Sequence, residues 1–151
     1  MIKLNNKGFS LVEVLAVVVI LGILAVIMFP VVNNIITENK ENNYNNLKNS
    51  ILSGAKTYIS DNRYNIELTS SSKCINSGDT RNISKIGDRT ISDSKIPVSF
   101  LTDYLSSNNI INPKDDKKLI MSESYVIVKY DCDNRDYTFT IDDSYLVWGN
   151  S

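Results

Sequence analysis

The chain has 151 residues, which leaves room for one modest domain beside a membrane-spanning segment. It carries 16 basic and 17 acidic side chains, a formal net charge of −1, so no overall positive field favours a nucleic-acid partner. It contains no histidine, which excludes Ser-His-Asp and Cys-His catalysis and removes the commonest metal ligand. Catalysis by paired carboxylates or by a Ser-Lys pair remains chemically possible, but no spacing in the sequence points to either. We therefore expect no enzyme, no cofactor and no metal.

The first element is an apolar segment at the N-terminus. Residues 14–32 carry no charged side chain, and with residues 9–13 they make a helix of about 24 residues, roughly 36 Å long. That length spans a hydrocarbon core of about 30 Å. Lys3 and Lys7 precede the segment, and the next basic residue is Lys40. The positive-inside rule then predicts a single-pass membrane protein with a cytoplasmic N-terminus and an exported remainder.

Glu13 lies near the start of this apolar segment and needs an explanation. A carboxylate costs about 2.5–3.5 kcal/mol at mid-bilayer and less towards the interface. The helix dipole returns only about 0.3–1 kcal/mol of that cost. A cleaved secretory signal does not fit, because its apolar region is shorter and is followed by a small-residue cleavage site. A plain membrane anchor explains the length of the segment and leaves Glu13 unexplained.

A third interpretation comes from the motif Gly-Phe-Ser-Leu-Val-Glu at residues 8–13, with a short basic leader before it and an apolar run after it. This motif closely resembles the processing site of type IV prepilins, the pilin and pseudopilin precursors of type IV pili, type II secretion systems and competence pili. Gly22 and Pro30 stand where pilins usually carry those residues. The resemblance covers residues 7–32 and beyond them is only architectural.

The resemblance implies a mechanism and a set of partners. A prepilin peptidase would cut after Gly8, and it or its associated N-methyltransferase activity would methylate Phe9. Glu13 lies four residues after Phe9, which is about one helical turn. During assembly it would meet the terminal amine of a neighbouring subunit. The partners would be other pilin subunits and the inner-membrane platform protein. The chain would move from the cytoplasmic membrane to a cell-surface filament.

Gly22 and Pro30 allow two interpretations. In a pilin filament, the stretch between them would bend or partly unwind when helices pack, because Pro30 removes one helical hydrogen bond and Gly22 adds backbone freedom. Alternatively, membrane helices simply tolerate both residues. The sequence does not decide between them.

The polar segment that follows continues the helix to about residue 60. Its apolar residues recur at helical spacings and share one face, comprising Ile36, Tyr44, Leu47, Ile51, Ala55 and Tyr58 or Ile59. We predict a leader at 1–8, a membrane and assembly part at 9–32, an amphipathic part at 33–60 and a globular head at 61–151. The predicted fold class is α+β and pilin-like, with a long N-terminal helix packed on a small antiparallel sheet.

The head is predicted as a loop region over 61–122 followed by a sheet over 123–148. Residues 69–95 are rich in Ser, Asn, Asp and Gly and indicate a long loop, with short strands only near Ile83 and Ile91. A short helix is expected at 98–105 and a turn at 113–116.

Three strands, 124–131, 137–141 and 145–148, should form an antiparallel meander. Period-two alternation predicts that Tyr137, Phe139 and Ile141 face the core.

Two further features of the head carry chemistry. Cys74 and Cys132 form either a disulfide, which an exported domain permits, or two separate buried thiols. A bridge closing about 59 residues would stabilise the fold by roughly 4 kcal/mol on the chain-entropy model. The acidic residues in 131–136 allow two interpretations, a calcium site or an ordinary hairpin turn. The EF-hand pattern does not fit, because Arg135 stands where it needs an oxygen ligand and Asp136 where it needs a glycine.

Two rival functions share the membrane helix and the exported head. One is a signal-anchored surface protein that binds a ligand and never polymerises. The other is a DNA-uptake pseudopilin within the same family. Residues 69–95 have a small excess of basic residues, but no aromatic side chains interleave with them, which argues against nucleic-acid binding.

Overall fold

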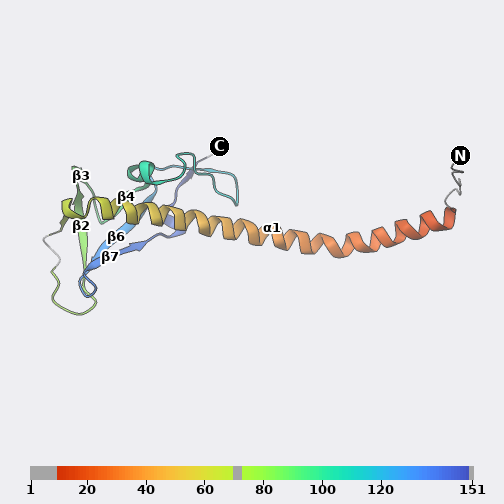
Figure 1. The fold of residues 1–151 in the computed structure, drawn as a ribbon, viewed down its shortest axis with the longest axis horizontal. Helices are drawn as coiled ribbons and strands as arrows, with labels where there is room; N and C mark the ends of the chain where they lie inside the picture. Colours follow the sequence, from red (N-terminus) through yellow and green to blue (C-terminus); the bar gives the residue numbers. More distant parts are fainter. Residues whose placement is uncertain (1–9, 70–72, 150–151) are drawn as a thin grey trace, which may run out of the picture. The chain divides into compact units, whose positions relative to one another are not determined.

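The structure is a computed structural model that describes residues 10–69 and 73–149. Two compact units make up the chain, Met1–Lys40 and Glu41–Ser151. A single helix, α1 (Leu11–Asp61), begins in the first unit and ends in the second (Figure 1). The predicted unbroken helix is thus confirmed from Leu11 onward, whereas residue 9 lies outside the described residues.

In the first unit α1 exposes its side chains along its whole length. Leu, Ile, Val, Met and Phe make up most of this surface, and such a surface is stable as a helix in lipid or against other apolar helices. Pro30 lies inside the helix, and its missing N–H removes one hydrogen bond without ending α1.

In the second unit one face of α1 is buried, comprising Tyr44, Ile51, Gly54, Ala55, Tyr58 and Ile59. All of these except Gly54 belong to the predicted apolar stripe, and Leu47 of that stripe is half-buried beside them. Ile36 is the exception: it remains 48% exposed because it precedes the unit that supplies the core. Ile36 thus shares the predicted helical face but lies outside its buried part.

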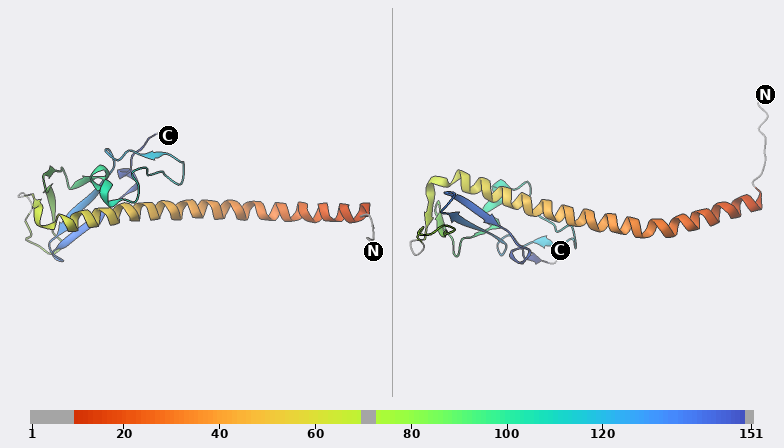
Figure 2. Two further views of the ribbon diagram at one scale, coloured as in Figure 1. Left: turned by 45° about the horizontal axis from the view of Figure 1, so that its top comes forward. Right: turned by 90° about the horizontal axis from the view of Figure 1, so that it is seen from below.

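A six-stranded antiparallel sheet supplies the other side of the core (Figure 2). Its strands are β1 (Ile66–Leu68), β2 (Thr80–Ile86), β3 (Arg89–Thr90), β4 (Lys95–Pro97), β6 (Tyr125–Asp131) and β7 (Asp136–Thr140). β6 is central: β7 pairs along one side of it, and β2 and β4 share the other side. β1 and β3 both pair with β2. A second, two-stranded sheet joins β5 (Lys118–Leu119) to β8 (Trp148–Gly149).

The region predicted as a loop over 61–122 contains four strands of this sheet, β1 to β4, so the loop prediction for this region is wrong. β2 runs for seven residues through a segment whose composition is polar. Ile83 and Ile86 are fully buried in the core, and their burial stabilises the strand by roughly 1.5–3 kcal/mol each. Gly87, at a φ of +57°, provides the left-handed turn between β2 and β3. Ile91 follows β3 and is buried, as expected near a strand.

Ser94 fills the position where β2 leaves β6 and β4 joins it. Its side chain is fully buried, and its backbone adopts a φ of +59°. Its Oγ accepts the N–H of Ile83 at 2.9 Å, and its carbonyl accepts the N–H of Val128 at 2.9 Å. One residue thus satisfies two backbone donors that the switch between strands would otherwise leave unpaired.

The last predicted strand, over 145–148, does not extend the meander. A 3₁₀ helix occupies Asp143–Tyr145, because the Asp142 carboxylate caps it by accepting the N–H of Ser144 at 3.0 Å. The chain then turns away and forms β8, which pairs with β5 and not with β7. The other predicted elements of the head are present, with a 3₁₀ helix at Val98–Tyr104 and a turn at 113–115.

The core lies between the buried face of α1 and the inner face of the sheet. Ile51 and Ala55 from the helix join Ile96, Val126 and Val128 from β4 and β6 in one cluster of fully buried side chains. Tyr137, Phe139 and Ile141 pack half-buried against this cluster, which confirms the alternation read from their sequence.

Candidate functional site

The described part of the N-terminal segment starts at Ser10. Gly8 and Phe9, the predicted cleavage and methylation residues, lie outside the described residues. The carbonyl of Ser10 accepts the N–H of Glu13 at 3.0 Å and that of Val14 at 3.2 Å, which forms the opening turn of the helix. Glu13 therefore stands in the first turn of α1, where unpaired N–H groups favour a carboxylate.

The surface around Glu13 is apolar and exposed. Leu11 is 84% exposed, and every described residue up to Asn43 is likewise exposed. Glu13 carries the only charge of the sequence between Ser10 and Thr37. A surface of this composition is unstable in water, so it needs lipid or other apolar helices as its environment. A single carboxylate at its edge then needs a positive partner.

Gly22 and Pro30 occupy the middle of the same apolar segment. A Cβ atom built on Gly22 has no heavy atom within 4 Å, so nothing in this chain requires a glycine there. Pro30 sits inside the continuous helix. Any steric requirement at Gly22 must therefore come from a neighbouring molecule.

The apolar part of α1 and the motif at its start are features shared with known proteins. α1 includes an 18-residue stretch long and apolar enough to cross a membrane, and none of that stretch is buried. Residues 3–29 match the family model for the prokaryotic N-terminal methylation motif. The chain carries a type IV pilin leader motif. No curated protein and no solved structure matches the chain.

The leader motif indicates the kind of protein at a coarse level. Proteins with this motif are precursors of pilin-like or pseudopilin type, which are structural and not catalytic. Together with the apolar helix, the motif indicates a membrane-anchored chain. The match ends at residue 29, so it says nothing about the head.

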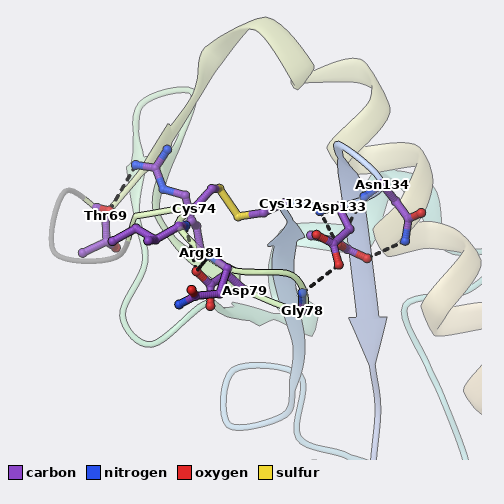
Figure 3. Close-up of a disulfide and its surroundings, with 11 residues drawn as sticks. Thr69, Cys74, Gly78, Asp79, Arg81, Cys132, Asp133 and Asn134 are labelled. Atoms are coloured by element: carbon purple, nitrogen blue, oxygen red, sulfur yellow. Dashed lines mark hydrogen bonds between the residues drawn. A yellow bond between two sulfur atoms is a disulfide. The ribbon is translucent and has the colours of Figure 1, made fainter.

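In the head, Cys74 and Cys132 are joined by a disulfide (Figure 3). It connects the segment before β2 to the turn between β6 and β7. Hydrogen bonds reinforce the same connection: the Asp133 carboxylate accepts the N–H of Gly78 at 2.7 Å and the hydroxyl of Ser77 at 3.0 Å. The two turns are therefore held together by a covalent bond and by polar contacts.

The acidic residues considered for calcium serve these turns as hydrogen-bond acceptors. Asp131 accepts the side chain of Asn134 at 2.7 Å and the N–H of Asp133 at 2.9 Å, and the Asn134 contact is the main cause that lowers the pKa of the Asp131 carboxyl. The backbone N–H groups of Asn76 and Ile75 lower the pKa of Asp79 in the same way. No group of three or more metal-ligating side chains occurs among residues 10–69 and 73–149.

A second cluster surrounds Tyr44 on α1, and sequence reasoning did not find it. Tyr44 is buried and lies 6.2 Å from the Trp148 ring. Lys114 lies 4.2 Å from the centre of the tyrosine ring and pairs with Glu41 at 2.6 Å. Burial, followed by the nearby charge of Asp143, raises the pKa of Tyr44 to about 12.

A further ion pair completes this cluster, with Lys48 and Asp143 at 2.8 Å. The cluster thus joins residues 41–48 of the helix to two segments about 70 and 100 residues later. Periodicity assigns Tyr44 to the buried face, but it gives no sign of which distant side chains will cover that face.

Proposed function

We propose that the chain is a structural subunit, a major or minor pilin or a pseudopilin, of a type IV pilus or a type II secretion-like filament. One observation carries this proposal: the match to the methylation motif at residues 3–29 overlaps a helical segment, residues 11–32, whose exposed surface carries no charge except Glu13. The chain's work is then assembly, and no catalytic residue is assigned.

The first step is processing at the membrane. A prepilin peptidase hydrolyses the peptide bond after Gly8 with water and releases the basic leader. The peptidase or its associated methyltransferase then transfers a methyl group from a sulfonium-type methyl donor to the new amine of Phe9, which breaks the donor's S–CH₃ bond and releases a proton. An N-methyl amine remains positively charged at neutral pH. Processing therefore creates a cation at the end of an apolar helix, one turn before Glu13.

The second step is assembly. The cost of keeping the Glu13 carboxylate in an apolar environment falls when a cation comes beside it. The amine of residue 9 on a neighbouring subunit can supply that cation only in the correct register, so Glu13 acts as an alignment residue. The platform protein in the inner membrane delivers subunits, and packing of α1 helices holds the filament together. Gly22 permits close approach of a neighbouring helix, and Pro30 marks the position where α1 can bend.

The two rivals predict other properties. A surface protein that never polymerises has no use for Glu13. A DNA-uptake subunit needs basic side chains available for phosphates. In this head Lys85 pairs with Glu67 at 3.3 Å, Arg89 lies over the Phe100 ring, and Lys95 lies over the Tyr125 ring. These cations have partners within the head, which favours the structural subunit over the DNA-binding one.

The experiment is an assembly assay with Glu13→Ala in the native host. The chain should reach the membrane and be processed, but it should be lost from the sheared filament fraction. Glu38→Ala is the matched control, because it removes a carboxylate from the same helix beyond the apolar segment, and it should assemble normally. Normal incorporation of Glu13→Ala into filaments would contradict the proposal and leave the anchored surface protein as the better account.

A further inference from the structure

Strand β7 has an open edge. Among the described strands β7 pairs only with β6. The N–H of Val128 donates to Ser94 and that of Cys132 donates to Asp79, so the even-numbered amides of β6 point away from β7. The odd-numbered residues of β6 therefore bond to residues 136, 138 and 140 of β7. It follows that the N–H and C=O groups of Tyr137 and Phe139 point outward from the sheet.

This edge lacks the features that usually keep edge strands from pairing. Soluble proteins protect such edges with lysine, proline, a bulge or a covering segment. β7 reads Asp-Tyr-Thr-Phe-Thr, with neither lysine nor proline, and its register with β6 is regular over all five residues. The strand is thus an available template for a seventh strand on its open side.

A groove lies beside this edge, between β7 and the last turns of α1. Its volume is about 420 Å³, and its lining includes Ile59, Tyr137 and Phe139. Lys56 and Arg63 provide the cationic part of the lining. Lys56 lies 6.0 Å from the Phe139 ring centre, and Arg63 lies 3.8 Å from the Asp136 carboxylate with both side chains more than half exposed. An added strand would cover the apolar lining and would meet positive charge at its ends.

We propose that a second copy of this chain occupies the edge, with the two β7 strands antiparallel about a two-fold axis at Thr138. Tyr137 and Phe139 of one copy then exchange hydrogen bonds with Phe139 and Tyr137 of the other. The four aromatic rings lie on the inner face of the joined sheet, where cross-strand aromatic pairs are favourable. The two Thr138 side chains face each other on the outer face.

The charges complement each other in this register. Asp136 of the second copy lies opposite Thr140. Lys56 contacts Phe139, next to Thr140, whereas Arg63 contacts Asp136 at the other end of the strand. The carboxylate of each copy therefore lies at the strand end where the lysine of the other copy contacts Phe139. A strand with lysine at its ends would meet repulsion there, which favours a second copy over a basic partner.

The direction of the pair follows from the same contacts. Lys56 precedes Arg63 along the chain, and Phe139 follows Asp136, so the end of α1 runs antiparallel to β7. The two-fold axis therefore also makes the α1 ends of the two copies antiparallel to each other. If the chain is a filament subunit, as proposed above, the pairing joins heads of filaments that run in opposite directions. Pairing of two five-residue strands buries far less surface than the roughly 1,200 Å² of a stable protein–protein interface, so each contact is weak. Many such contacts along two filaments would together give stable binding.

The test is disulfide trapping of the full chain in detergent, at a detergent excess that leaves one copy per micelle. In the proposed register, residue 138 opposes itself in a non-hydrogen-bonded pair with a Cα separation of about 4.5 Å, within disulfide range. Mild oxidation of Thr138→Cys should give a band at twice the monomer mass that disappears on reduction. The unsubstituted chain, which has no free cysteine, should give none.

Thr140→Cys is the matched control on the same face of the same strand. Its two copies would lie about 14 Å apart along the antiparallel pair, too far for a disulfide. Alone it should give no dimer, but mixed with Asp136→Cys it should give the mixed dimer, because 136 opposes 140. Adding Thr138→Lys to both chains should abolish that mixed dimer through opposed like charges.

Two results would overturn the proposal. One is the absence of a Thr138→Cys dimer when the wild-type fold is retained. The other is equal trapping of Thr138→Cys and Thr140→Cys alone, which would mean random collision. The trapping uses the unprocessed chain and does not involve residues 8–13. Failure here is therefore distinct from failure of the filament assignment.

Discussion

Replacing Ser94 by alanine should destabilise the head without changing its shape. Ser94 is fully buried, and its Oγ accepts the N–H of Ile83 at 2.9 Å. Alanine keeps the Cβ and the same backbone strain at a φ of +59°, so the change isolates the hydroxyl. It leaves one buried N–H without an acceptor, which costs about 1–3 kcal/mol.

The assay is urea unfolding of the full chain in detergent, followed by the fluorescence of Trp148, which is the only tryptophan and packs against the core. With a urea slope of about 2 kcal/mol per M, a loss of about 2 kcal/mol lowers the midpoint by about 1 M. Ser92→Ala, at an exposed position two residues earlier, should change stability by less than about 0.5 kcal/mol.

A second variant separates the hydrogen bond from the strain. Ser94→Gly also loses the acceptor, but glycine adopts the left-handed backbone without the penalty that alanine pays there. It should therefore be more stable than Ser94→Ala by about 0.5–1 kcal/mol, after the larger entropy of unfolded glycine is subtracted. A midpoint for Ser94→Ala equal to that of the unsubstituted chain would refute the role assigned to this hydroxyl.

Three further predictions use the same assay. Reduction of the disulfide should lower the unfolding free energy by about 4 kcal/mol, and an unchanged midpoint would mean that the closed loop adds nothing. Folding raises the pKa of Tyr44 to about 12, so the neutral phenol is favoured in the folded state. Its contribution to the free energy of unfolding is therefore complete below the usual pKa of about 10 and is lost as the pH rises from 10 towards 12. Between about pH 10 and 12 the Tyr44→Phe chain should lose less stability than the unsubstituted chain. An equal loss in the two chains would contradict this prediction. Gly54→Val should cost about 1–3 kcal/mol because a Cβ meets the Leu105 side chain at 3.0 Å. Ser53→Val, exposed beside it, should cost little, and equal losses would refute the close-packing argument.

The helix was predictable because its signals are local. Apolar length, Glu13 and the motif at residues 8–13 lie within one short segment, and the buried stripe from Tyr44 to Ile59 repeats at helical spacing. Ile36 fits the same spacing and is nevertheless exposed. Periodicity identifies a face, whereas the place where that face becomes buried depends on where the head begins.

The head was less predictable because its contacts are distant. β2 looks polar, and its pairing with β6 depends on residues almost fifty positions later. The carboxylate of Asp142 looks like part of a simple hairpin turn, but it caps a 3₁₀ helix that redirects the chain to β5. Ser94 has no sequence signal at all, since its role arises only where two strands meet β6.

The most direct test of the account is the N-terminus of the chain in its native membrane. Intact mass and N-terminal sequencing should be done with and without the prepilin peptidase. With the peptidase we expect a mature chain that starts at N-methyl-Phe9, and without it a chain that keeps residues 1–8. A chain that retains the leader when the peptidase is present would contradict the assignment and would leave Glu13 as an unexplained charge on a plain membrane anchor.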